Sequence, residues 1–356
     1  MEKVKLSDIC NPKQWRTIPT SDLLNEGYPV YGANGIIGYY SEYNHENPVV
    51  TVTCRGATCG SINITVPNAY ITGNAMCLDD VRSDIEMDYL YYCLKHYNFN
   101  NVISGSAQPQ ITRQGMDKIY ISIYGHDEQK KIIEKLKKVE NIINLRKQEI
   151  QLLDDFIKAR FVEMFGDARK NPNKYDTVSF IDIVEYMGDI GSNGANKVVV
   201  DHLDMKDKED YAMMVRFTNF TKNDFTDDVK YVSKEAYDFF KKSQIFGGEL
   251  IICKIGSAGQ NYVMPYLNRP VSLGLNQIMV RIKDNILMPY LYQYLHTDYG
   301  EFLISGCING AVTKTITKTE LKKIPVMLPP MELQREFVAF VEQVDKLKYV
   351  AIQAAV

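Results

Sequence analysis

Two polar loops carry the residue types that grip phosphate groups and read base edges. They lie at residues 105–113 and 306–318. Backbone amides and small hydroxyls beside Arg or Lys suit phosphate oxygens, while Gln can pair with adenine and Arg with guanine. A polar loop is often only a connection, but its recurrence at matching positions favours DNA binding. The residues that we expect to contact DNA here are Gln108, Gln110, Thr112, Arg113, Thr313, Lys314, Thr315 and Lys318.

Two glycine turns offer a second pair of phosphate-binding candidates. Arg55-Gly56-Ala57-Thr58 and Lys254-Ile255-Gly256-Ser257 each place a basic residue and a hydroxyl beside a glycine at the end of a β-branched strand. A plain hairpin turn explains the same pattern almost as well. We select Arg55, Thr58, Lys254 and Ser257 as candidates.

Two further segments combine glycines with amides and aromatic or basic side chains. They lie at residues 31–40 and 192–197 and differ from each other, as two modules that read different sequences require. The candidates there are Tyr31, Asn34, Asn193, Asn196 and Lys197.

Signatures of catalysis are missing from the sequence. There is no GxxxxGK[ST], GxGxxG, GxSxG or HExxH motif. The five histidines occur singly and without metal-ligand spacing, and acidic pairs such as Asp154-Asp155 are typical of a solvated helix face. The [DNS]PP[YF] motif of amino-methyltransferases is absent too. We therefore expect no catalytic residue, no bound metal and no cofactor of the chain's own.

Length and composition point to a two-domain protein of near-neutral charge. The chain has 356 residues, 45% of them hydrophobic, and a formal net charge of −3, so a nucleic-acid partner must be met by local basic patches. Seven cysteines without a CxxC pair favour a reducing compartment. With no apolar run typical of a signal peptide or membrane span, we expect a cytoplasmic protein.

The elements that must position these loops repeat with a period of about 200 residues. A strand and glycine turn at 50–60 match 250–259, with Arg55 the counterpart of Lys254, and an aromatic helix at 89–94 matches 290–295. Residues 103–106 match 304–307 at an offset of 201 residues. By contrast, the segments 1–48 and 170–248 share almost nothing. This pattern predicts two copies of one scaffold that present different surfaces.

Each copy ends in a long helix with an apolar heptad seam. Residues 127–165 contain neither Pro nor Gly, and a second seam begins after Pro329-Pro330. One seam alone indicates a helix packed on its own domain, whereas two matching seams predict an antiparallel pair. The predicted seam residues are Ile132, Leu136, Val139, Ile143, Ile150, Leu153, Ile157, Phe337, Phe340, Val344 and Leu347.

The predicted architecture is therefore α+β, with two tandem mixed α/β domains, each followed by a long helix. We expect a first domain at 1–125, a central spacer helix at 126–166, a second domain at 167–330 and a shortened C-terminal helix at 331–356. The two helices are expected to pack as an antiparallel coiled coil.

In this arrangement the chain resembles the specificity subunit of type I restriction-modification systems. The similar strings are Pro329-Pro330-Met331-Glu332-Leu333-Gln334, Phe161-Val162-Glu163-Met164-Phe165-Gly166, residues 31–39 and residues 215–220, which add Arg216 to the DNA-binding candidates. Two features depart from the family: Tyr124-Gly125 stands where a Pro-Pro pair would precede the first helix, and the last helix is short.

The resemblance implies a non-catalytic subunit that binds double-stranded DNA. Each domain would read one half of a split target, with the helices as spacer. The implied partners are two methyltransferase subunits, which use S-adenosylmethionine, and restriction and translocase subunits, which use ATP and Mg. The short last helix leaves self-association through the helices open. The alternative is a tandem coiled-coil scaffold that binds protein or glycan ligands.

Overall fold

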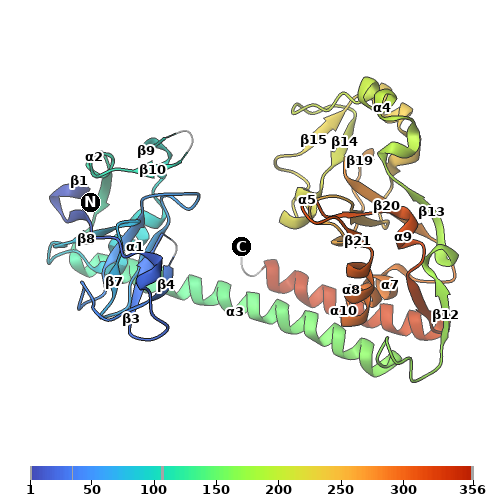
Figure 1. Ribbon diagram of the computed structural model, residues 1–356, viewed down its shortest axis with the longest axis horizontal. Helices are drawn as coiled ribbons and strands as arrows, with labels where there is room; N and C mark the ends of the chain where they lie inside the picture. The colour runs from blue at the N-terminus through green and yellow to red at the C-terminus, as the bar shows by residue number, and fades with distance from the viewer. Residues whose placement is uncertain (1, 34, 106–107, 354–356) are drawn as a thin grey trace. The chain divides into compact units, whose positions relative to one another are not determined.

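The structure, a computed structural model, describes residues 2–33, 35–105 and 108–353. The chain divides into two compact units, Met1–Asn144 and Leu145–Val356, which we call unit 1 and unit 2 (Figure 1). Both units mix helices with small sheets, which confirms the predicted α+β class of two tandem domains. The boundary falls inside the central helix, so each unit includes part of that helix.

Unit 1 is built on an antiparallel sheet of four strands and a second sheet of three. The first has the order β2-β8-β5-β6 and the second the order β4-β3-β7, in which β3 and β7 are parallel. A separate pair joins β1 to β11. The strand bounds are β1 Glu2–Lys5, β2 Asn11–Gln14, β3 Tyr28–Gly32, β4 Gly35–Tyr40, β5 Val50–Thr53, β6 Ile62–Ile64, β7 Tyr70–Ile71, β8 Ala75–Asp79 and β11 Tyr120–Ile123.

Strand β8 shows how alternation builds the core of unit 1. Successive side chains of a strand point to opposite faces. Met76 and Leu78 accordingly join the apolar cluster that includes Leu90 and Leu94 of helix α1 (Met87–Lys95), while Cys77 joins a second cluster on the other face. A hairpin of β9 (Ile103–Ser104) and β10 (Gln110–Ile111) and the short helix α2 (Arg113–Met116) complete the unit.

Unit 2 repeats this plan on a larger scale. Its sheets have the orders β13-β20-β17-β18 and β15-β14-β19-β16, and β12 pairs with β23. The strand bounds are β12 Asp176–Ser179, β13 Val184–Gly188, β14 Ala212–Val215, β15 Lys230–Val232, β16 Gln244–Ile245, β17 Leu250–Cys253, β18 Asn261–Val263, β19 Val271–Leu273, β20 Gln277–Ile282, β21 Ile308–Asn309, β22 Thr315–Ile316 and β23 Pro325–Leu328. The helix bounds are α4 Asn196–His202, α5 Phe217–Lys222, α6 Lys234–Phe239, α7 Met288–Leu295, α8 Asp298–Gly306 and α9 Lys318–Leu321.

The front segments share more than their sequences suggest. β14 pairs with β15 in antiparallel fashion and with β19 in parallel, as β3 pairs with β4 and β7. The segments 1–48 and 170–248 were expected to have almost nothing in common. This is true of their amino-acid sequences but not of their strand pairing. Strand pairing uses backbone groups, so the frame survives when side chains diverge. Unit 2 adds helices α4, α5 and α6 to this frame.

The long helices are α3 (His126–Phe165) and α10 (Met331–Gln353). Within unit 2, the end of α3 packs on α10. The Phe161 and Phe337 rings lie 5.5 Å apart, the Phe156 and Phe340 rings 5.0 Å apart, and Lys348 pairs with Asp154 at 2.6 Å. Residue numbers fall along one helix as they rise along the other, so the packing is antiparallel, as predicted.

The structure divides the predicted seam into buried and exposed parts. Ile157, Phe337 and Val344 are buried, and Leu153 and Phe340 are half-buried against them. Ile132 packs instead on the core of unit 1, and Ile143 and Ile150 are half-buried. For Leu136, Val139 and Leu347 the prediction of a buried seam position is wrong, because these side chains are 37%, 51% and 57% exposed. No helix in the described ranges is long and apolar enough to span a bilayer.

Equivalent hydrogen bonds tie each long helix to its own unit. The buried Gln129 accepts from the Glu86 amide and donates to the Asp84 and Tyr124 carbonyls. In unit 2 the corresponding contacts belong to Gln334, which accepts from the Leu287 amide and donates to the Pro329 carbonyl at 2.9 Å. Because buried amides must be paired, these two glutamines fix the start of each helix against the aromatic helix of its unit.

Candidate nucleic-acid interface

The glycine turn and the polar loop of unit 1 lie side by side. Arg55 forms a β-bridge with Gln110, the Gly56 amide donates to the Pro109 carbonyl at 3.1 Å, and the Ile111 amide donates to Cys54. The side chains of Arg55, Gln108 and Gln110 are exposed. Tertiary structure thus joins two segments that are about fifty residues apart in sequence into one polar surface.

Unit 2 repeats this junction. Ile255 forms the β-bridge with Thr315, and the Gly256 amide donates to the Lys314 carbonyl at 3.2 Å. The Ile316 amide donates to Lys254. Both units therefore build the same two-loop surface from equivalent backbone bonds.

The bonds also correct the sequence alignment of the turns. Gly56 and Gly256 make the same contact, which makes Ile255, not Lys254, the counterpart of Arg55. Lys254 corresponds to Cys54, since their amides donate to Asn276 and Asn74 respectively. The predicted pairing of Arg55 with Lys254 is therefore wrong by one residue. In both segments the basic residue follows a cysteine, but the structurally shared feature is the glycine.

Glycines hold both polar loops in shape. Gly105 follows β9 and Gly310 follows β21, and they have φ of +86° and +99°, which an L side chain rarely adopts. The predicted match of 103–106 with 304–307 is therefore wrong, because 304–306 belong to helix α8 and the strand equivalent to β9 is β21. A Cβ at either position would also collide with a carbonyl oxygen, that of Gln108 or of Thr313. These glycines allow the loops to turn back on themselves, and they leave Lys314 and Thr313 exposed at the surface.

After each loop, a threonine caps a short helix that begins with a basic residue. Thr112 accepts from the Gly115 amide at 3.1 Å, and Thr317 accepts from the Glu320 amide at 3.3 Å. Thr112 thus serves as a helix cap. The first helical residues are Arg113 and Lys318, so the two units place a cation at equivalent positions.

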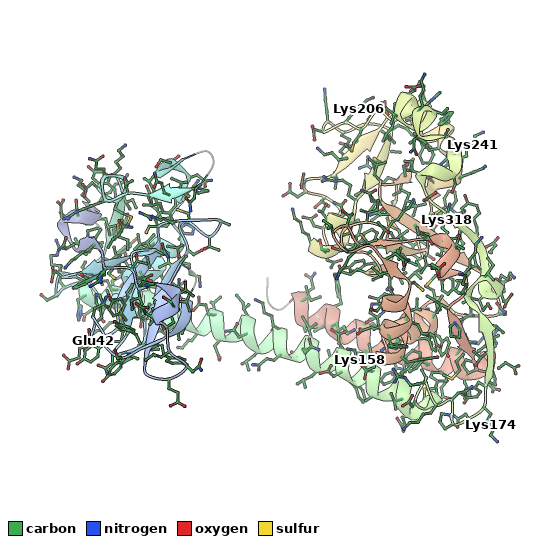
Figure 2. The ribbon with its side chains drawn as sticks, in the orientation of Figure 1. Glu42, Lys158, Lys174, Lys206, Lys241 and Lys318 are labelled. Atoms are coloured by element: carbon green, nitrogen blue, oxygen red, sulfur yellow. The ribbon has the colours of Figure 1, made fainter. Side chains whose placement is uncertain are left out.

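In unit 2 a buried carboxylate holds two of the predicted DNA-binding lysines. Asp189, only 5% exposed, lies 2.8 Å from Lys254 Nζ and 2.9 Å from Lys318 Nζ (Figure 2 labels Lys318). Ser192 donates to the same carboxylate at 2.9 Å. Burial alone would raise the pKa of Asp189, but the bonds from Lys254, Lys318 and Ser192 lower that pKa to about 2. The cluster carries one net positive charge and a fixed geometry.

The described residues of unit 1 form no such charged cluster. Gln14 lies beside β8 at the position that Asp189 takes beside β20, so the two residues are equivalent. The side-chain amide of Gln14 donates to the Gly73 carbonyl at 2.8 Å and to Cys54 Sγ. Arg113 donates instead to Asn11 Oδ1 at 3.1 Å. The same frame therefore presents a different charge pattern in each unit.

Three candidates have structural roles instead of an open surface position. Tyr31 is 7% exposed, and its hydroxyl accepts from the Val66 amide. The Asn193 amide bonds Ser243 Oγ at 2.7 Å and two backbone groups. Arg216 pairs with Asp228, at 3.3 Å from its carboxylate. Sequence alone could not distinguish these polar groups from surface ones, because their partners lie up to fifty residues away.

The remaining candidates are placed as follows. Asn34 lies outside the described residues. Ser257, Asn196 and Lys197 are exposed and Thr58 is half-buried. Asn196 and Lys197 begin α4, which Figure 1 places at the end of unit 2 away from α10. Sequence reasoning missed Asp189, although its position two residues before Gly191-Ser192-Asn193 was the available signal.

Comparisons with known proteins agree with this arrangement. A family model described as the type I restriction modification DNA specificity domain matches residues 1–154 and 182–354. The specificity subunit of the type I restriction enzyme EcoprrI from Escherichia coli is 28% identical over 117 residues, which are 33% of this chain and 29% of that protein. The chain thus matches less than a third of that relative's length.

Two further similarities extend over nearly the whole chain. The putative type I restriction enzyme specificity subunit S.HindORF215P from Haemophilus influenzae is 21% identical over 337 residues, covering 93% of this chain and 84% of that protein. The crystal structure of a type I restriction-modification system S subunit from M. genitalium has a TM-score of 0.54 at 13% identity, over 99% of this chain and 91% of that one. With the family's domain present in both units, the chain belongs to the type I restriction-modification DNA specificity family.

Proposed function

We propose that this chain reads a bipartite DNA target, with one half-site assigned to the two-loop surface of each unit. The observation that carries the proposal is the repeated junction of glycine turn and polar loop. Equivalent backbone bonds hold it in both units, yet the side chains differ: Arg55 stands opposite Gln110 in unit 1, and Ile255 opposite Thr315 in unit 2. One frame with two sets of side chains is what two different half-sites require.

The exposed residues divide by chemistry into two roles. Gln108 and Gln110 can each make two hydrogen bonds to an adenine edge, so they are proposed to read bases in unit 1. Arg113 and Lys314 are exposed cations beside backbone amides, and they are proposed to contact phosphates. In unit 2, Asp189 restrains Lys254 and Lys318, so these two cations would meet DNA as a rigid pair.

The catalytic steps are proposed to belong to partner subunits. Two methyltransferase subunits that use S-adenosylmethionine would dock along α3 and α10, and restriction subunits would supply ATP- and Mg-dependent cleavage. Support comes from the sequence, which lacks both the P-loop and the methyltransferase motif. A near-neutral chain that keeps its DNA-facing cations in a few loops fits a reading subunit within such a complex.

Selection from a random DNA library tests this proposal. The chain, copurified with a methyltransferase subunit, should recover a motif of two half-sites separated by a fixed gap. Gln110→Ala should relax base preference in one half-site only. Thr315→Ala should affect only the other half-site.

Two outcomes would contradict the proposal. Recovery of DNA fragments that share no sequence motif would contradict sequence-specific recognition by this chain. Relaxation of both half-sites by Gln110→Ala would remove the assignment of one half-site to each unit. Asn25→Ala, at an exposed position of unit 1 outside the long helices, provides the control for loss of a side-chain amide and should leave the whole motif unchanged.

A further inference from the structure

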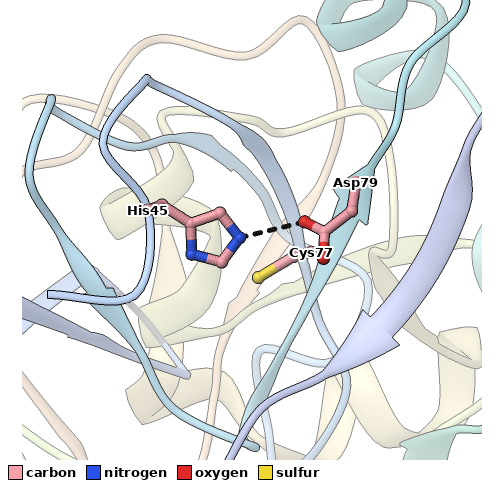
Figure 3. A group of neighbouring side chains, drawn as sticks. All are labelled: His45, Cys77 and Asp79. Carbon is pink, nitrogen blue, oxygen red and sulfur yellow. Dashed lines mark hydrogen bonds and ion pairs between the residues drawn. The ribbon is translucent and has the colours of Figure 1, made fainter.

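Three potential metal ligands converge on one face of strand β8 in unit 1. Cys77 and Asp79 are two residues apart and so point to the same side of the strand, and His45 approaches from the segment between β4 and β5 (Figure 3). His45 Nε2 lies 2.9 Å from Asp79 Oδ1. The donor atoms of the three residues all lie within 4.8 Å of one another. Sequence spacing gave no sign of this cluster, because its members come from two separate segments.

The neighbouring Asn44 fixes the tautomer of His45. The Ile71 amide donates to Asn44 Oδ1 at 2.9 Å, and Asn44 Nδ2 donates to the Ile71 carbonyl at 3.0 Å. This pair of bonds orients the Asn44 amide, so its oxygen is the atom that faces His45 Nδ1 at 2.7 Å. A carbonyl-type oxygen can only accept, and Nδ1 therefore carries a hydrogen.

This orientation creates a conflict on the other side of the ring. A neutral imidazole with hydrogen on Nδ1 presents a lone pair at Nε2. That lone pair faces Asp79 Oδ1, an acceptor whose companion oxygen already accepts from Trp15 Nε1 at 3.1 Å. Two acceptors 2.9 Å apart need a hydrogen or a metal ion between them. Either a second ring proton or a metal ion would satisfy both.

We propose that His45, Cys77 and Asp79 bind one divalent transition-metal ion of the zinc type. Imidazole nitrogen, thiolate and carboxylate oxygen are the donors that zinc accepts. The third donor favours a metal over a lone proton, because one zinc-type ion can bond imidazole, carboxylate and thiolate together, whereas a proton shared by His45 and Asp79 engages only two of the three groups. When the metal binds, the Cys77 thiol releases its proton to solvent and a sulfur–metal bond forms.

The surroundings have the features of a supported metal site. Asn44 orients the imidazole, and Trp15 orients the carboxylate, as outer-shell groups do around bound metals. The side chains of His45 and Asp79 are 11% and 14% exposed, whereas Cys77 is buried, so an ion would be approached by solvent from the side of the imidazole and the carboxylate. The ion would tie the His45 segment to β8. This inference does not depend on DNA recognition, and its test uses no DNA.

Cobalt binding to the metal-free full chain tests the site. One Co²⁺ per chain should bind and give a thiolate-to-cobalt charge-transfer band in the near ultraviolet. Zn²⁺ should displace the cobalt and raise the melting temperature. Cys77→Ser should abolish the band, and His45→Gln should weaken binding at least tenfold. Cys59→Ser, a change to another thiol of unit 1 outside the cluster, should retain full binding.

The opposite results would overturn the proposal. Absence of saturable cobalt binding, or a charge-transfer band that survives Cys77→Ser, would exclude this site. Should Cys77→Ser fail to fold, the unmodified chain still decides, because a cobalt spectrum without thiolate character contradicts the ligand set. An NMR spectrum of the His45 ring that shows hydrogen on both nitrogens after zinc addition would assign the cation to a proton.

Discussion

Asp189 and Lys318 form an ion pair of 2.9 Å across 129 residues of sequence. The pair joins the end of β13 to the start of α9, and Lys254 completes it from the end of β17. The carboxylate is almost fully buried, whereas the two lysines keep about a third of their side-chain surface exposed. A buried anion therefore fixes two cations at the surface that we propose for DNA.

Replacing this carboxylate tests its structural role. Asp189→Asn should lower the free energy of unfolding by about 2 kcal/mol, because hydrogen bonds from two ammonium groups are lost in a buried position. Urea unfolding followed by circular dichroism measures the change. Asp284→Asn, at an exposed position of unit 2, is the control and should stay within about 0.5 kcal/mol of the parent. Equal stability of both variants would show that the cluster contributes nothing to folding.

The same cluster predicts a dependence on pH. The pKa of Asp189 is lowered from 3.8 to about 2, so the folded state favours the charged carboxylate. Its contribution to stability is complete above pH 3.8 and is lost as the pH falls towards 2. The difference in stability between the parent and Asp189→Asn should therefore shrink in this interval. A difference that stays constant from pH 6 to about pH 2 would contradict the assignment.

The proposed phosphate contacts predict a change in salt dependence. Arg113→Ala and Lys314→Ala should each weaken binding to all DNA sequences and lower the slope of log K against log salt by about 0.9. Fluorescence anisotropy at several salt concentrations measures the slope. Lys3→Ala, at an exposed position of β1, should leave it unchanged. A slope that is unchanged in Arg113→Ala would exclude this residue as a phosphate contact.

The buried glutamines at the two helix starts make a further prediction. Gln334→Ala should cost about 2–3 kcal/mol, since the Leu287 amide and the Pro329 carbonyl lose their buried partner. Gln129→Ala should have a similar effect in unit 1. Denaturant unfolding provides the measurement. Gln343→Ala, on the exposed face of α10, should change stability by no more than about 0.5 kcal/mol.

The aromatic contact between the long helices can be tested in the same way. Phe337→Ala should lower unfolding free energy by about 3–5 kcal/mol, because the ring is fully buried against Phe161 and Phe165. Leu347→Ala, at a seam position that is 57% exposed, should cost less than about 1 kcal/mol. If Leu347→Ala lowered the unfolding free energy as much as Phe337→Ala, another surface would have to cover Leu347 of α10 in solution.

Much of the architecture follows from the sequence because it depends on local patterns. Periodicity and the absence of Pro and Gly predicted helix α3 to within a residue, and Pro329-Pro330 marked the start of α10. Repetition of short strings predicted two copies of one scaffold. The polar loops were also visible, since small, polar and glycine residues recur after each aromatic helix.

Other features required contacts that the sequence does not encode locally. Tyr31 and Asn34 lie in the same glycine-rich string, yet only packing shows that Tyr31 belongs to the core. Arg216 has the chemistry of a DNA contact, but its guanidinium forms an ion pair with the Asp228 carboxylate. A heptad seam predicts which residues share an apolar face, but it does not show which part of that face another element covers. The sequence therefore could not distinguish the buried Phe337 from the exposed Leu347.

The sequence by itself determined the repeat, the positions of the long helices and the loops that could bind DNA, because each is visible in short strings or in the periodicity of one continuous segment. Only the tertiary structure decided which polar groups are free to act. Asp189 engages Lys254 and Lys318, Asn44 orients His45 towards Asp79, and Gly56 bonds to Pro109 as Gly256 bonds to Lys314. In each case chain folding brings distant groups within hydrogen-bond distance, and burial makes leaving such groups unpaired costly.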